Sequence, residues 1–81
     1  MFDKSRIDLD NIENSYDYII ECLNRVYIKR IIEYLIENGV DLNIVFDYLD
    51  NNNIDIKYNV VAMILIEHRY EGLIKKYFNF F

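Results

Sequence analysis

The chain contains no proline and no tryptophan, and it has only two glycines and one cysteine in 81 residues. The single cysteine, Cys22, excludes an internal disulfide and fits a reduced, intracellular compartment. Two isolated glycines exclude a glycine-rich phosphate-binding loop. The longest uninterrupted apolar run, residues 60–66, is far shorter than the roughly 20 residues that cross a bilayer. We therefore expect an intracellular protein located in the cytoplasm, for example the cytoplasm of an infected host cell. We expect no membrane partner.

Basic residues are also scarce, because nine Lys and Arg stand against fourteen Asp and Glu, which leaves a formal net charge of -5. Direct binding to nucleic acid relies on a basic stripe that neutralises phosphates. The local basic residues Arg25, Lys29 and Arg30 do not outweigh the acidic balance of the chain. We expect no direct nucleic-acid binding.

Apolar residues, by contrast, make up 53% of the chain. A chain this short forms one domain, here residues 1–81, and buries only about 60% of the surface that it exposes when unfolded. The apolar surplus, which includes Phe78, Phe80 and Phe81, has two explanations. It forms a dense monomeric core, or it is covered by a second copy in a structural or regulatory homo-oligomer such as a homodimer.

The apolar residues recur at helical spacing in most of the chain. Residues 1–9 read as a loose arm, and Asp10 with Glu13 forms a candidate capping box for the first helix. The pattern predicts an all-α fold, a compact bundle or stack of four to five short helices joined by tight corners. The alternative is an α+β fold with a strand near 54–66, although we favour a helix from Ile56 to about Arg69. The apolar positions are Ile12, Tyr16, Ile19, Ile20 and Leu23, then Ile28, Ile31, Ile32, Leu35 and Ile36, then Leu42, Val45, Phe46 and Leu49, and finally Leu73, Ile74, Tyr77 and Phe78.

Two stretches echo each other, EYLIENGVDLN at 33–43 and DYLDNNNIDIK at 47–57. Gly39 and Asn53 occupy the position where a helix ends on a residue of positive φ. Asp41 and Asp55 follow two residues later, where each is expected to cap the next helix. The echo therefore predicts two copies of one helix corner.

The same stretches resemble the start of a calcium loop, but the likeness fails. Such a loop needs Gly at its sixth position and Glu at its twelfth. A loop that starts at Asp41 has Phe46 and Asn52 at these positions. We expect no metal and no cofactor.

Catalytic chemistry is not indicated either. His68 is the only histidine, and it has no Cys or Asp partner at a fixed spacing. Cys22 lies in a helical pattern and reads as a small core residue. Small all-helical chains rarely build a pocket that excludes water, so we expect that the protein is not an enzyme.

The segment IIEYLIENGVDLN resembles the end of an ankyrin repeat, in which a second helix finishes in Leu, Asn-Gly, a small residue, Asp and an apolar residue. AMILIEHRYEGLIKKYF is similar to the two helices of such a repeat, so the likeness covers about half of the chain. The Thr-Pro-Leu-His opening of the repeat is missing, and the period of fourteen differs from about thirty-three. The resemblance implies a degenerate ankyrin-like helical module that binds protein without catalysis.

An acidic residue directly precedes a tyrosine at three places, a pairing that offers contact area together with charge complementarity. The alternative is that these tyrosines pack helix corners and that the acidic residues are only solvated. We hypothesise a non-enzymatic binding module, for example a small viral or phage inhibitor of the anti-CRISPR kind, that occupies a basic surface of a host defence or nucleic-acid enzyme. An ankyrin-like scaffold fragment is a further alternative. The candidate contact residues are Asp17, Tyr18, Glu33, Tyr34, Asp47, Tyr48 and Asp50.

Overall fold

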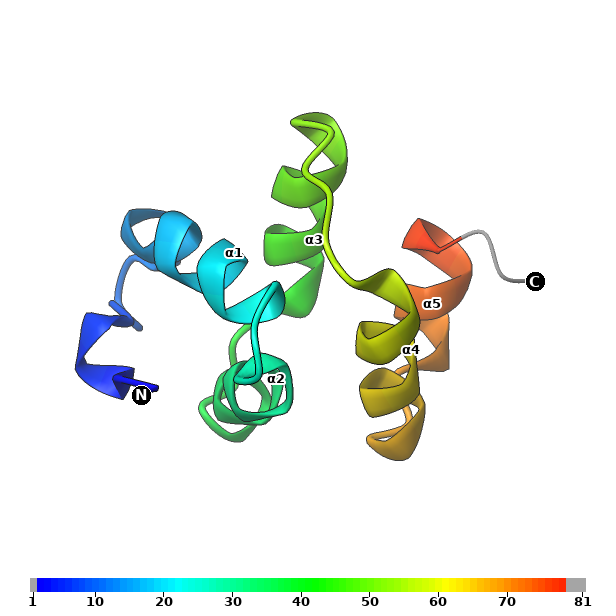
Figure 1. Ribbon diagram of the computed structural model, residues 1–81, viewed down its shortest axis with the longest axis horizontal. Coiled ribbons are helices and arrows are strands. Elements are labelled where there is room, and N and C mark those ends of the chain that lie inside the picture. The colour runs from blue at the N-terminus through cyan, green and yellow to red at the C-terminus, as the bar shows by residue number, and fades with distance from the viewer. Residues whose placement is uncertain (1, 79–81) are drawn as a thin grey trace.

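The computed structural model describes residues 2–78, and every regular element in this range is a helix. The all-α prediction with four to five short helices is confirmed, and within the described range the segment 58–67 is a helix and not a strand. The elements are the 3₁₀ turns η1 (Lys4–Arg6) and η2 (Ile12–Ser15) and the helices α1 (Tyr16–Leu23), α2 (Ile28–Glu37), α3 (Leu42–Asn51), α4 (Tyr58–Glu67) and α5 (Glu71–Tyr77) (Figure 1).

The helices pack as a chain of neighbours around one core. Helix α2 contacts α1 and α4, and α5 contacts α4 and α3. Figure 1 accordingly shows α4 between α2 and α5. The apolar helix faces predicted from the sequence form this core, because all of their residues are buried or half-buried. The most deeply buried large side chains include Ile19, Leu23, Ile31, Ile32, Leu35, Leu49, Val61, Leu65 and Ile74.

The two predicted helix corners are confirmed. Gly39 ends α2 at φ 71°, and Asn53 ends α3 at φ 51°. At each corner the next N–H, that of Val40 or Ile54, reaches back 2.9 Å to the carbonyl of Leu35 or Leu49. This is the hydrogen-bond pattern of a Schellman motif.

A third copy of this corner ends α4. Arg69 has φ 66°, and the N–H of Tyr70 donates to the carbonyl of Leu65 at 2.8 Å. Arginine is an unfavourable residue for this conformation, because its Cβ crowds the backbone there. The presence of Gly or Asn at a helix end therefore cannot be used to predict this third corner from the sequence.

Of the three predicted caps only one exists. The Asp41 carboxylate accepts from the N–H of Asn43 at 2.9 Å and caps α3 as expected. Asp55 does not cap α4, which begins two residues later than expected, after Lys57 and without a side-chain cap. The capping box of Asp10 and Glu13 is also wrong, since η2 starts after Asn11 without a side-chain cap.

Helix α1 ends at Leu23, and Asn24 is its C-cap residue. The Asn24 side-chain amide donates to the carbonyl of Ile20 and to that of Asp55, both at 3.3 Å. The second bond ties the α1–α2 corner to the segment that precedes α4. This amide therefore helps to set how the first and second halves of the chain pack.

The segment expected to be a loose arm is attached to α1 at several points. The Ser15 hydroxyl, 2% exposed, accepts from the N–H of Asp8 at 2.6 Å and lies 3.3 Å from the carbonyl of Arg6. Ile7 is buried, and the ring of Phe2 stacks on Tyr18. A buried serine thus satisfies backbone groups where the arm meets η2 and α1.

The structure describes only one of the three phenylalanines named as apolar surplus. Phe78 is buried against Phe46 and Tyr58, so it offers no surface to a partner, and Phe80 and Phe81 lie outside the described residues. Three of the large apolar side chains that are exposed lie instead on α4, namely Val60, Met63 and Ile66. Within residues 2–78, no helix has both the length and the apolar character that crossing a membrane demands.

Candidate functional site

Carboxylates gather along α3 and at both of its ends. Asp41 caps the helix, Asp47 and Asp50 lie one turn apart on it, and Asp55 follows its C-terminal corner. All four side chains are exposed. We call these four residues, together with Tyr77 of α5, the acidic surface of α3.

Tyr77 reaches this surface from α5, thirty residues further along the chain. Its hydroxyl donates to the Asp47 carboxylate at 2.5 Å and also lies 3.3 Å from the carbonyl of Asn43. Burial, followed by the hydrogen bond to Asp47, raises the pKa of Tyr77 above its ordinary value of 10.0. The phenol is therefore neutral at physiological pH and acts as a fixed donor to the carboxylate.

Lys76 and Tyr58 mark the two ends of the acidic surface. A hydrogen bond with Tyr77 is the largest cause of the raised pKa of Lys76, and the charges of Asp47 and Asp41 raise it further. At the other end, burial raises the pKa of Tyr58, and the nearby charges of Asp50 and Asp55 add to the effect. Asp41 and Asp47 therefore act on Lys76 at one end of α3, and Asp50 and Asp55 act on Tyr58 at the other.

Tyr18, one of the candidate contact residues, is a core residue and cannot present its ring to a partner. It is 8% exposed, and its hydroxyl accepts from the N–H of Asp3 at 2.6 Å. The Arg6 guanidinium covers its ring at 4.1 Å from the centroid. Its neighbour Asp17 is exposed on α1 and makes no contact with the acidic surface among the described interactions.

Glu33 and Tyr34, the second candidate pair, have structural partners. The Glu33 carboxylate lies 3.1 Å from Nε2 of His68, which links α2 to the residue that ends α4. Tyr34 is half-buried, and its ring meets the edge of Phe2. This pair therefore belongs to the packing of α2 more than to an open surface.

The Tyr48 ring packs between two helices, whereas the side chains of Asp47 and Asp50 are exposed to solvent. The rings of Tyr48 and Tyr16 lie 4.1 Å apart between centroids, which joins α3 to the start of α1. Tyr48 is half-buried, whereas Asp47 and Asp50 are exposed. Of the seven candidate residues, only these two carboxylates share one open surface.

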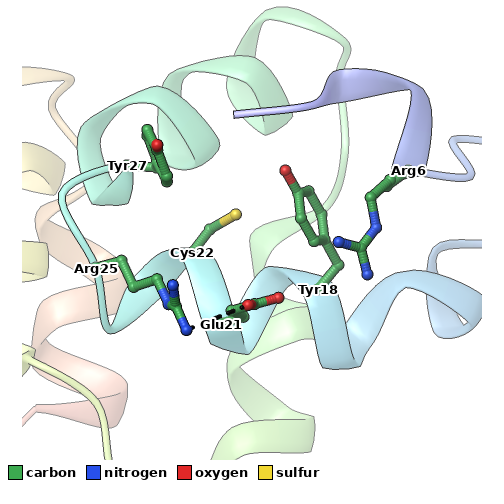
Figure 2. Close-up of a pocket in the computed structure, with 6 residues that line it drawn as sticks. All are labelled: Arg6, Tyr18, Glu21, Cys22, Arg25 and Tyr27. Carbon is green, nitrogen blue, oxygen red and sulfur yellow. Dashed lines mark ion pairs between the residues drawn. The ribbon is translucent and has the colours of Figure 1, made fainter. Parts of the chain in front are cut away.

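A small cavity lies apart from this surface, between α1, η1 and the start of α2. Its volume is about 120 Å³, below the roughly 300 Å³ at which ordinary ligand pockets begin. Figure 2 shows the Cys22 side chain directed between Tyr18 and Tyr27, with Arg25 beside Glu21 at 3.4 Å. Its lining residues are Arg6, Tyr18, Glu21, Cys22, Arg25 and Tyr27.

The cavity does not activate its cysteine. Cys22 is 1% exposed, and burial raises the pKa of its thiol above the ordinary value of 9.0. A catalytic thiol needs the opposite shift, because the thiolate is the nucleophile. His68, the other candidate for chemistry, is engaged with Glu33 and does not line the cavity.

No cluster of three or more His, Cys, Asp or Glu side chains that could hold a metal ion occurs within the described range. No family model, no curated protein and no solved structure matches the chain. The ankyrin-like resemblance therefore stays a prediction.

The sequence did not predict the link between Tyr77 and the acidic surface of α3. Its position in the pattern placed it on the apolar face of the last helix, and its ring does pack near Phe46, 5.9 Å between centroids. Only its hydroxyl reaches Asp47. No local signal in the sequence pairs two residues that lie thirty positions apart.

Proposed function

We propose that the protein is a non-enzymatic binding module that presents the acidic surface of α3 to a basic surface of another protein. The observation that carries the proposal is the set of four exposed carboxylates, Asp41, Asp47, Asp50 and Asp55, around one short helix. Opposite charges across an interface speed association and select partners more than they add affinity. A chain with this arrangement is suited to rapid, salt-sensitive recognition.

Tyr77 supports the same proposal. Tyrosine is enriched in protein interfaces, because it adds a large contact area for little loss of side-chain freedom. Here the hydroxyl is already held by Asp47, so the ring is ordered before a partner arrives. Preorganisation of this kind lowers the entropic cost of binding.

The narrower form of the proposal concerns the class of target. A basic groove that normally holds nucleic acid is a surface of the matching sign, and a protein with net charge -5 can occupy it in place of phosphates. A small viral or phage inhibitor of a host defence or nucleic-acid enzyme, as anti-CRISPR proteins are, would work in this way. A competition experiment tests this narrower proposal. If the chain occupies a groove that holds nucleic acid, the oligonucleotide that the target normally binds should displace the chain.

The test begins with a tagged chain recovered from the cells that produce it, and with identification of the proteins that accompany it. A purified partner is then titrated by calorimetry with the wild-type chain and with the double variant Asp47→Asn, Asp50→Asn. Asparagine keeps an acceptor for the Tyr77 hydroxyl but removes both charges. We expect the double variant to bind at least tenfold more weakly, and raising the salt from 50 to 500 mM to weaken the wild-type complex.

The matched control changes net charge by the same amount at another place. Asp10 and Glu37 are exposed and lie outside the acidic surface. The variant Asp10→Asn, Glu37→Gln should therefore bind within about twofold of the wild type. Equal loss in both double variants, or binding that is indifferent to salt, would show that the acidic surface of α3 is not the contact.

A further inference from the structure

Helix α4 carries an apolar stripe that nothing in residues 2–78 covers. Val60, Met63 and Ile66 are 40%, 65% and 47% exposed, while Val61, Ala62, Ile64 and Leu65 on the opposite side are buried. A helix that is apolar on all sides is ordinarily buried on all sides. The exposed stripe is therefore a candidate contact surface.

The stripe continues into a hollow at the N-terminal end of α4. Residues 56–60 line this open hollow, which has a volume of about 450 Å³. Val60 belongs both to the hollow and to the stripe. The surface thus extends along the whole length of the helix, which suits a long partner such as another helix.

We propose that this surface binds a second copy of the chain, with the two α4 helices antiparallel and related by a two-fold axis at Met63. A two-fold contact uses the same patch on both copies, so the patch must match its own reversed image. Val60 and Ile66 stand three residues before and after Met63 and therefore about 4.5 Å from it along the helix. The apolar residues therefore have the same spacing on both sides of Met63, as a two-fold contact requires.

The charges beside the stripe select the antiparallel arrangement. Lys57 immediately precedes α4 and Glu67 is its last residue, so the two opposite charges lie at the two ends of the helix that carries the stripe. Antiparallel helices bring Lys57 opposite the second copy's Glu67, and the pair occurs twice. Parallel helices would instead bring lysine opposite lysine and glutamate opposite glutamate, which is unfavourable.

Both charged groups are available for such pairs. Glu67 is 59% exposed and has Lys29 at 3.9 Å, the outer limit of an ion pair. Lys57 is exposed and forms no ion pair in the part of the chain that the structure describes. New pairs can therefore form without breaking a strong contact.

This contact goes beyond the proposed function, and salt separates the two. Each copy has net charge -5, so two copies repel each other at a distance, and salt screens this repulsion. Salt also screens the exposed Lys57–Glu67 pairs, so self-association that rests mainly on the apolar stripe is expected to change little in salt. Binding through the acidic surface of α3 is expected to weaken in salt.

The contact is small, because one helix face from each copy falls below the roughly 1,200 Å² of a stable interface. We therefore expect a dissociation constant on the order of 100 µM, not a permanent dimer. Sedimentation equilibrium of the full chain from about 10 µM to about 1 mM should show the mass rising from 9.9 kDa towards twice that value. A mass that stays at 9.9 kDa throughout overturns the proposal and leaves the stripe to a partner of different sequence.

The variant Met63→Glu places two like charges at the axis and should raise the dissociation constant at least tenfold. Val26→Glu is the matched control, because Val26 is 87% exposed in the α1–α2 corner and the change in charge is identical. Circular dichroism verifies that both variants fold, and Val60→Gln with Ile66→Gln replaces Met63→Glu if that variant does not. Equal behaviour of the stripe variant and the control overturns the assignment to α4.

Charge exchange tests the orientation. Lys57→Glu and Glu67→Lys should each weaken the dimer severalfold, and the double variant, which restores opposite charges in the antiparallel arrangement, should recover most of the wild-type affinity. A double variant that is as weak as the sum of its two singles overturns the antiparallel pairing.

Discussion

The hydroxyl of Tyr77 donates a 2.5 Å hydrogen bond to the carboxylate of Asp47, and this bond joins the last described helix to the open surface of α3. Tyr77→Phe removes the bond but keeps the ring against Phe46. We expect a loss of about 1 kcal/mol in the free energy of unfolding, because the acceptor is charged but exposed to solvent. Urea denaturation followed by circular dichroism measures it.

Tyr70→Phe is the control for that experiment. Tyr70 is half-buried like Tyr77, and its hydroxyl makes no hydrogen bond among the described residues. Its removal should change stability by less than about 0.5 kcal/mol. Equal losses in the two variants would mean that the Tyr77 bond contributes nothing.

The two glycines form a matched pair with opposite expectations. An added Cβ meets nothing within 4 Å at Gly39 or at Gly72, so only the backbone differs. Gly39 has φ 71°, whereas Gly72 lies inside α5. Gly39→Ala should lower stability by about 1 kcal/mol, and Gly72→Ala should raise it by about 0.5–1 kcal/mol. Thermal unfolding of both variants decides this, and shifts of the same sign would refute the corner geometry.

Arg69 holds the positive φ of 66° that glycine would adopt freely. Arg69→Gly should therefore stabilise the protein by up to about 1 kcal/mol, because relief of the crowded Cβ outweighs the added freedom of the unfolded chain. Arg30→Gly, in the interior of α2, should destabilise by about 1 kcal/mol. A loss of stability in both variants would place Arg69 outside the left-handed region.

The two aspartates of the echo should behave differently in spite of their matching sequence. Asp41 accepts from the N–H of Asn43, whereas the Asp55 side chain makes no cap. Asp41→Ala should lower the free energy of unfolding by about 1 kcal/mol, and Asp55→Ala should leave it within about 0.5 kcal/mol. The difference between the two in one denaturation series is the measurement, and losses of equal size would contradict the observed start of α4.

Stability should fall in alkaline solution. Burial raises the pKa of Tyr16, Tyr18, Tyr58 and Tyr77 above 10.0 and that of Cys22 above 9.0. Groups whose folded pKa is raised stabilise fully below the unfolded pKa, and this stabilisation is lost as the pH rises through the folded pKa. The melting temperature should therefore hold to about pH 9 and then decline. A melting temperature that is unchanged up to pH 11 would show that these groups ionise equally in both states.

The helices could be predicted from the sequence because apolar spacing and two corner residues, Gly39 and Asn53, carry local information. The third corner could not, since Arg69 is a poor residue for its own conformation and is held there by the Tyr70 N–H bond to Leu65. Asp41 and Asp55 show the limit of the echo, because equal spacing from a corner does not fix where the next helix begins.

The sequence alone could not predict which of the candidate contact residues are exposed on the surface. An acid beside a tyrosine looks the same at Tyr18 as at Tyr48, but burial depends on which elements pack over the ring. Phe2 and Arg6 cover Tyr18, and these contacts are set by a segment that carried no helical pattern. The exposed stripe on α4 could not be predicted for a related reason. When a helix is apolar on all sides, its sequence does not show which side is left uncovered by the other helices.

The three corners have a consequence for the speed of folding. Each corner closes through hydrogen bonds between residues only a few positions apart, such as Val40 to Leu35. Proteins dominated by such local contacts fold in microseconds to milliseconds. The links between distant segments, of which Asp47 to Tyr77 is one, span only about 30 residues. Because the chain contains no proline, refolding should also lack the slow phase, tens of seconds long, that prolyl isomerisation imposes.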